Sequence, residues 1–127
     1  MSDFIVVGIG GFIGSCVRFA FTKLARLLPP SFPYGTLFSN ITAAFLVGLI
    51  IGIGQQTSIL SPRTKLFLTT GIMGGLSTFS TFSMETVALF QDGRYWVAVG
   101  NILLNLALSL SFTVFGVLLA RTLFSKA

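Results

Sequence analysis

Residues 71–85 read GIMGGLSTFSTFSME, and this stretch decides the fold of the chain. It lies within a segment that is otherwise apolar enough to span a membrane, yet it contains three glycines, a run of Ser and Thr hydroxyls and the carboxylate of Glu85. A helix surrounded by lipid does not carry such groups, because each unsatisfied polar group in hydrocarbon is energetically costly. The stretch is therefore predicted to face another helix or a water-filled path, which is typical of a functional site in a membrane protein.

The composition predicts an integral membrane protein. Of the 127 residues, 54% are hydrophobic and 9% are charged, and the mean hydropathy is +0.94. A soluble domain has about 25% charged residues, so this chain lacks the charge to cover a water-exposed surface. The predicted fold class is an all-α membrane protein whose single domain, residues 1–127, has four transmembrane helices. Their expected spans are about 4–28, 34–54, 62–90 and 95–123.

Several classes of function are excluded by the residue types present. The chain has no histidine, and its acidic residues are Asp3, Glu85 and Asp92. A metalloenzyme or a histidine-based catalyst is thus excluded for a single chain, and the absence of nucleophile–base pairs argues against any enzyme. The net charge is +5, but the basic residues lie at the ends of segments, as membrane anchors do, and not in a nucleic-acid-binding patch. The single cysteine, Cys16, allows no internal disulfide.

Small residues recur at four-residue spacing along the first two spans. The sets are Gly10 and Gly14, Gly11 and Ser15, and Ala44, Gly48 and Gly52. Such spacing lets helix backbones approach closely. These ridges are therefore expected to pack against other helices, including helices of a second copy of the chain.

Two polar residues inside the first two spans each allow two interpretations. The amide of Asn40 is either an interhelical hydrogen-bonding group or a neutral donor for a passing anion. Arg18 is either an arginine whose charged end reaches the membrane surface or a cation that attracts anions to a pore entrance.

In the third span, the cluster of Gly71, Gly74 and Gly75 is predicted to permit a local break. A break would free backbone carbonyls, which can coordinate a cation if they are shielded from lipid. Phe79 and Phe82 follow three residues apart, and on spacing alone they are a core pair.

A helix that resumes at Thr78 would place Thr78, Thr81 and Glu85 on one narrow face. This face is a track of hydroxyls that ends in a carboxylate. In the fourth span a second polar stripe recurs every four residues, at Asn101, Asn105, Ser109 and Thr113. Whether that stripe faces other helices or ions is left open by the sequence.

The basic residues are almost evenly divided between the two sides of the membrane. One side would hold Arg63, Lys65, Arg121 and Lys126, and the other Lys23, Arg26 and Arg94, with Arg18 as a possible fourth. The positive-inside rule therefore has little bias to act on, which favours insertion in both orientations and an antiparallel dimer. Four short helices are also too few to enclose a solvated path, so a two-fold homodimer is the simplest assembly.

The sequence resembles the Fluc (CrcB-type) fluoride channel family. GGLSTFSTF at 74–82 is similar to the signature of the family's third helix, GGFIGSCVR at 10–18 to its first-helix motif, and GTLFSN at 35–40 to its second-helix motif. The resemblance covers essentially the whole chain. Two departures are visible: Ser77 stands where the family usually has threonine, and Ala43 where a glycine commonly follows the asparagine.

The resemblance implies an antiparallel dual-topology homodimer in the bacterial plasma membrane, with two fluoride pores and a central structural sodium ion. Such a channel would export fluoride passively and relieve its toxicity. The residues implied for the fluoride path are Asn40, Phe79, Ser80, Thr81, Phe82 and Glu85. Arg18 would lie at the pore entrance, and the backbone carbonyls of Gly74 and Ser77 from both subunits would bind sodium.

Two other functions are considered. A dual-topology proton-coupled exporter, similar to the small multidrug transporters, depends on a carboxylate deep in the first helix. The first span has none after Asp3, so Glu85 is the sole candidate for proton coupling. The other is a purely structural membrane subunit, in which the hydroxyls and amides only join helices. The residue types favour the channel over these two alternatives. Fluoride is small and tightly hydrated, so a pore must replace its water with compact donors and the positive edges of phenyl rings.

Overall fold

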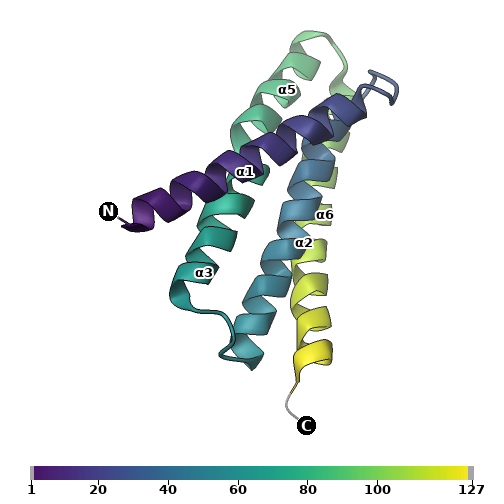
Figure 1. The fold of residues 1–127 in the computed structure, drawn as a ribbon. Coiled ribbons are helices and arrows are strands. Elements are labelled where there is room, and N and C mark those ends of the chain that lie inside the picture. Colours follow the sequence, from purple (N-terminus) through teal and green to yellow (C-terminus); the bar gives the residue numbers. More distant parts are fainter. Residues whose placement is uncertain (1, 126–127) are drawn as a thin grey trace.

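The computed structural model describes residues 2–125, which form helices and the turns between them (Figure 1). In chain order the helices are α1 (Ser2–Ala25), α2 (Tyr34–Gln56), α3 (Pro62–Leu66), η1 (Phe67–Met73), α4 (Gly74–Leu76), α5 (Phe79–Gln91) and α6 (Tyr95–Phe124). Three of them, α1, α2 and α6, are long and apolar enough to cross a membrane. The expected all-α membrane class is confirmed. Lys126, part of the predicted charge balance, lies outside the described residues.

The first helix ends three residues before its predicted end. From Arg26 to Leu28 the backbone amides donate to carbonyls three residues back instead of four, which tightens the chain into turns. Pro29 and Pro30 follow, and the helical conformation is disfavoured for a residue that precedes a proline. The helix therefore ends at Ala25.

Residues 62–91 contain two helical runs separated by two extended residues. The first run begins at Pro62, where the Ser61 hydroxyl caps the helix, and continues through η1, a π-helix, into α4. Ser77 then has ψ 152°, and Thr78 has φ −149° and ψ 116°. Thr78 caps α5 by accepting a hydrogen bond from the Thr81 amide at 3.2 Å.

The glycines of this segment have a different role from the predicted one. We expected Gly71, Gly74 and Gly75 to be the point of interruption, but all three lie in helical conformation and the interruption follows Leu76. The reason is that two of them are needed for packing against α1. Glycine at a close crossing removes the side chain without breaking the helix.

α1 runs obliquely across the other helices (Figure 1). It packs closely against η1 and α4. A Cβ atom on Gly10 would lie 2.8 Å from the Cα of Gly71, and one on Gly14 would lie 2.0 Å from the carbonyl oxygen of Ile72. A Cβ on Gly75 would lie 2.6 Å from a carbonyl oxygen of α1. These positions accept only glycine in this packing.

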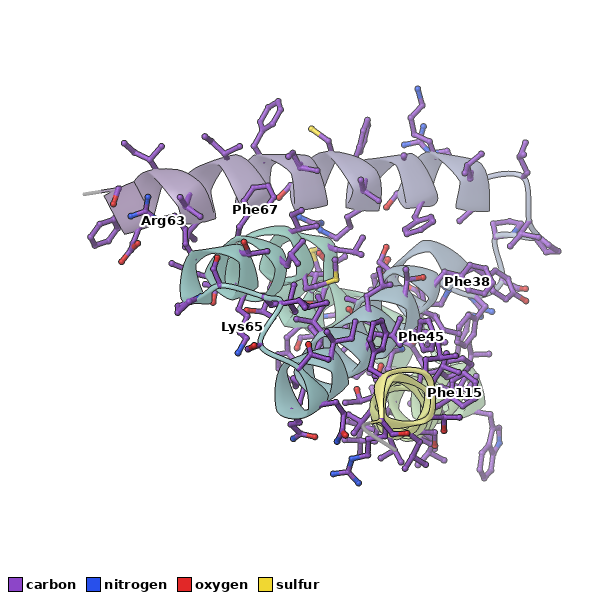
Figure 2. All side chains as sticks on the ribbon, turned by 60° about the horizontal axis from the view of Figure 1, so that its bottom comes forward. Phe38, Phe45, Arg63, Lys65, Phe67 and Phe115 are labelled. Carbon is purple, nitrogen blue, oxygen red and sulfur yellow. The ribbon has the colours of Figure 1, made fainter. Side chains whose placement is uncertain are left out.

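The second small-residue ridge packs against α6. A Cβ atom on Gly48 would lie 2.2 Å from the carbonyl oxygen of Thr113, and one on Gly52 would lie 2.6 Å from the Ala120 side chain. Phe45 and Phe115 lie where α2 meets α6 (Figure 2). Their ring centroids are 5.6 Å apart. These glycines are thus filled by helices of the same chain. Gly11 and Ser15 are different, because they line an open hollow on the surface of α1. The expectation that small residues provide contacts with a second copy therefore stays a prediction.

The small core lies where α2 meets the first helical run of residues 62–76. Ala43, one of the two departures from the family pattern, is 3% exposed and packs with Met73 and Leu76. Its methyl group fills core space, so the departure does not disturb local packing. Outside this core, many large apolar side chains are exposed, including Phe4 on α1 and Trp96 on α6. Such a surface suits contact with lipid.

Candidate functional site

A cavity of about 410 Å³ opens beside the extended residues Ser77 and Thr78. It is lined by residues of α2, the 62–91 segment and α6. The polar and aromatic residues among them are Asn40, Thr69, Ser77, Thr78, Phe79, Phe82, Asn105 and Ser109. The backbone of Gly74 also lines it. The structure thus brings together the amide, the two phenylalanines and the two predicted carbonyl ligands, although they come from two separate parts of the sequence.

The two phenylalanines form a pair with unequal surroundings. Their ring centroids lie 5.6 Å apart, with the ring planes at 53°. Phe82 is 8% exposed, whereas Phe79 is 75% exposed. The expectation from spacing alone, that both rings belong to the core, is therefore wrong for Phe79, which projects from the chain beside the cavity.

Asn40 is held by the interruption and by α6. Its Oδ1 accepts a hydrogen bond from the Thr78 amide at 2.8 Å, and its Nδ2 donates to the Thr78 carbonyl at 3.3 Å and to Asn105 Oδ1 at 3.0 Å. Both amide protons are thus engaged within the chain. The interhelical interpretation of Asn40 describes this arrangement, and an anion would have to replace one of these bonds to be bound by the amide.

The interruption redirects the amides that would otherwise cover two carbonyls. In a continuous helix the Thr78 amide would donate to Gly74 and the Thr81 amide to Ser77. The Thr78 amide donates to Asn40 instead, and the Thr81 amide donates to the Thr78 hydroxyl. Gly74 and Ser77 are both exposed. Their carbonyl oxygens can therefore take a ligand from outside this chain.

The Ser77 hydroxyl does not take part in binding such an outside ligand. Its Oγ donates to the Met73 carbonyl at 3.0 Å, one turn back along the helix. The side chain at this position is therefore engaged locally. Replacing the usual threonine by serine leaves the carbonyl available.

Hydroxyls of α5 continue from the first cavity towards a second. Thr78 lines the first cavity and donates to Thr81 Oγ1 at 3.1 Å, while Ser80 Oγ lies 3.5 Å from Thr78 Oγ1. Thr81 and Glu85 both line a second cavity of about 340 Å³, between α2 and the turn at 28–33. In the described part of the chain, the Oε1 atom of Glu85 is buried and has no hydrogen-bond partner.

Arg18 is bonded within the chain, and this contact tests neither of its two predicted roles. Its Nε donates to the Gly75 carbonyl at 3.0 Å, and the side chain is half-buried. It lies at the C-terminal end of the first helical run, where the helix dipole is negative and a cation is stabilised. A cation lining the second cavity was missed in the sequence: Arg26, which is brought there by the turn after α1.

The polar stripe of α6 faces mainly other helices. Asn101 and Asn105 are buried and bond to each other and to neighbouring helices. Thr113 donates to the Ala44 carbonyl of α2 at 3.2 Å, and Ser109 lines the first cavity. Sequence reasoning missed the partner of Asn101, which is Thr86. Thr86 is a single hydroxyl residue on the buried face of α5, and no sequence pattern marks it as a partner of Asn101.

A family model described as CrcB-like protein, Camphor Resistance (CrcB), matches residues 5–117 of the chain. The chain belongs to the CrcB family. A CrcB relative from Clostridium perfringens, named fluoride-specific ion channel FluC, is 47% identical over 121 residues, which cover 94% of each chain. Relatives with the same name from Clostridium novyi and Serratia proteamaculans are 46% and 45% identical, again over 94% of each chain.

Membership of the CrcB family confirms the resemblance found in the sequence. It also makes the chain a channel-family protein and not an enzyme, as expected from its residue types. Together with three long apolar helices, it identifies a multi-pass membrane protein, which in a bacterium lies in the inner membrane.

Proposed function

We propose that this chain forms a fluoride-selective channel, which passes fluoride passively across the membrane and so relieves fluoride toxicity. The proposal is carried by the 47% identity, over nearly the whole chain, to a relative named fluoride-specific ion channel FluC. It is supported by the cavity beside Thr78, where an amide, hydroxyls and two phenyl rings converge. Expression in bacteria that lack their own fluoride export tests it. Growth in fluoride should be restored, and failure of a membrane-inserted protein to restore it would overturn the proposal.

The proposed path runs along α5. Fluoride would pass the edges of Phe79 and Phe82, where the phenyl quadrupole is positive, and then the hydroxyls of Ser80 and Thr81 towards Glu85. Asn40 would take part by exchanging one hydrogen bond for the ion. Neutral donors that already have partners bind an anion weakly, and weak binding at several points lets the ion both enter and leave.

The third membrane span, in this proposal, is residues 62–91, with its interruption at Ser77 and Thr78 near the middle. The two helical runs on either side are each too short to cross a bilayer, because a span needs about 20 helical residues. Joined end to end across the interruption, they give the length required. The chain then has four spans.

The interruption also supports a second copy of the chain as partner. Gly74, Ser77, Phe79 and Ser80 are exposed at the middle of this span. Irregular backbone at membrane depth is tolerated only where protein or a water-filled cavity covers it. We therefore propose a homodimer that meets at the interruption, with one pore on each side. The even division of basic residues favours an antiparallel arrangement.

A sodium ion at the dimer axis would explain the uncovered carbonyls. In residues 2–125 there is no cluster of three or more His, Cys, Asp or Glu side chains that could hold a metal. Backbone oxygens of Gly74 and Ser77 from two copies would replace the hydration shell of a small cation instead. Protein prepared without sodium should release fluoride slowly and recover when sodium is restored. Full release without sodium would contradict this assignment.

Arg18 would contribute to the same region. Its bond to Gly75 places a positive charge beside the interruption, which would attract anions towards the pore entrance. In this proposal the positive charge has two effects. It stabilises the C-terminal end of the first helical run, and it raises the local concentration of anions.

A further inference from the structure

Four polar side chains, three of them buried and Asn40 half-buried, form a continuous hydrogen-bonded chain, here called the amide relay: Asn40, Asn105, Asn101 and Thr86. Asn40 donates to Asn105 Oδ1 at 3.0 Å, and Asn105 donates to Asn101 Oδ1 at 2.9 Å. Asn101 donates to Thr86 Oγ1 at 2.9 Å, and Thr86 donates to the Phe82 carbonyl at 2.7 Å. Every link donates in the same direction. The orientation of each amide is therefore fixed by its neighbours.

Both ends of the relay lie on the first turn of α5. At one end Asn40 bonds the amide and carbonyl of Thr78, and at the other Thr86 bonds the carbonyl of Phe82. Residues 78–82 are the turn that carries both phenylalanines. Thr86 belongs to α5 itself, so α6 reaches this turn through the bond from Asn101 to Thr86. The relay thus clamps the turn directly from α2 and indirectly from α6, beginning at Thr78, the second of the two extended residues.

Burial makes each link of the relay costly to lose. Asn101 is 0% exposed and does not line either cavity described above, and Thr86 is also buried. A buried amide that loses its partner keeps the full cost of its desolvation. Because the links are in series, a change at Thr86 also affects Asn101, two links away from the cavity-lining Asn40.

We propose that Asn101 and Thr86 are positioning residues that set anion selectivity by holding the turn with Phe79 and Phe82 in one geometry. This inference rests on the proposed fluoride channel. Phenyl edges discriminate for a small anion only while the rings stay in place. When the clamp is lost, the rings can turn aside and a larger, less hydrated anion such as chloride gains access. Neither residue touches the ion.

The test compares three variants with the unsubstituted protein in liposomes, by the ratio of fluoride to chloride release. Thr86→Val keeps the shape of the side chain and removes its hydroxyl, whereas Thr86→Ser keeps the hydroxyl. Thr113→Val is the matched control, because it removes a similar bond between α6 and α2 outside the relay. We expect Thr86→Val to lower the ratio about tenfold, the equivalent of one buried hydrogen bond. Thr86→Ser and Thr113→Val should leave it within about twofold.

A purely structural role predicts a different result. The ratio in Thr86→Val would then equal that of the unsubstituted protein, even if the protein unfolds at a lower temperature, and the inference would be overturned. If Thr86→Val does not fold, the ratio is measured in the double variant Asn101→Leu, Thr86→Val, which replaces both bonded groups with apolar ones. An unchanged ratio in that variant overturns the inference as well.

Hydrogen exchange separates failure of this inference from failure of the proposed function. If the unsubstituted protein releases no fluoride, the proposed function is wrong, and the clamp is judged by backbone exchange of residues 78–82. Faster exchange there in Thr86→Val, but not in Thr86→Ser or Thr113→Val, supports the clamp. Equal exchange in all variants contradicts it.

Discussion

Asn40 bonds both backbone polar groups of Thr78, accepting from the amide at 2.8 Å and donating to the carbonyl at 3.3 Å. One side chain of α2 thus replaces the hydrogen bonds that the chain gives up where its helix is interrupted. These bonds would keep the interruption stable at the membrane depth proposed for it, because an amide and a carbonyl left unpaired there would be costly.

Replacing Asn40 should therefore damage the fold and the transport path together. Asn40→Leu removes all three bonds and should lower the free energy of unfolding by about 2–3 kcal/mol. Thermal unfolding of the purified protein in detergent measures this, together with fluoride release. Asn40→Asp keeps the acceptor for the Thr78 amide but turns a carboxylate towards two acceptors, the Thr78 carbonyl and Asn105 Oδ1, so it should be at least as destabilising as Asn40→Leu. Equal stability of all three proteins would show that the bonds do not hold the interruption.

Phe82 distinguishes a pore residue from a core residue. Phe82→Ile keeps an apolar side chain of considerable size but removes the ring and its positive edge. If Phe82 lines the fluoride path, release of fluoride should fall at least tenfold while the protein remains folded. Phe45→Ile, at a ring pair between α2 and α6 away from the cavity, is the control and should retain release. Unaltered conduction in Phe82→Ile would count against the pore assignment.

The crossing of α1 with η1 offers a test of packing inside one chain. Gly14→Ala would place a methyl carbon 2.0 Å from a carbonyl oxygen, and overpacking of this kind should cost about 1–3 kcal/mol or more. Gly8→Ala is a control on the same helix, where the added methyl group would meet no atom of another helix of the described chain within 4 Å. It should leave stability unchanged or raise it by up to about 1 kcal/mol, from helix propensity. Equal unfolding temperatures for the two variants would contradict this crossing.

The dual-topology hypothesis predicts that a small charge bias abolishes activity. Two lysines added to the 57–61 loop, by Ser58→Lys and Ile59→Lys, should trap one orientation, because the even charge balance offers little resistance. Two lysines on the opposite side, by Gln91→Lys and Asp92→Lys, should trap the other. Each variant alone should fail to protect cells from fluoride, and the two together should succeed. Full protection by either one alone would refute the hypothesis.

The long helices and their close packing could be predicted because they depend on patterns within short stretches of the sequence. Apolar runs and prolines predicted the long helices, and four-residue spacing of glycines predicted close helix packing. Partners across helices could not be predicted in this way. Asn40 and Asn105 are 65 residues apart, and their contact depends on how α2 and α6 cross, which no local pattern encodes.

The position of the interruption shows the same limit. Glycine weakens a helix, so the sequence directs attention to Gly71, Gly74 and Gly75. In the structure, packing against α1 keeps Gly71 and Gly75 helical, and the side chain of Asn40 stabilises extended backbone further on. Tertiary contacts therefore decided between two uses of glycine that local preference could not separate.

The most direct test of the central claim is ion release from liposomes that contain the purified protein. Liposomes loaded with potassium fluoride or potassium chloride, at equal pH inside and outside, are triggered with valinomycin and followed with ion-selective electrodes. A selective passive channel predicts fast release of fluoride and none of chloride without any proton gradient. No release of either ion, or fluoride release that requires a proton gradient, would contradict a passive fluoride channel.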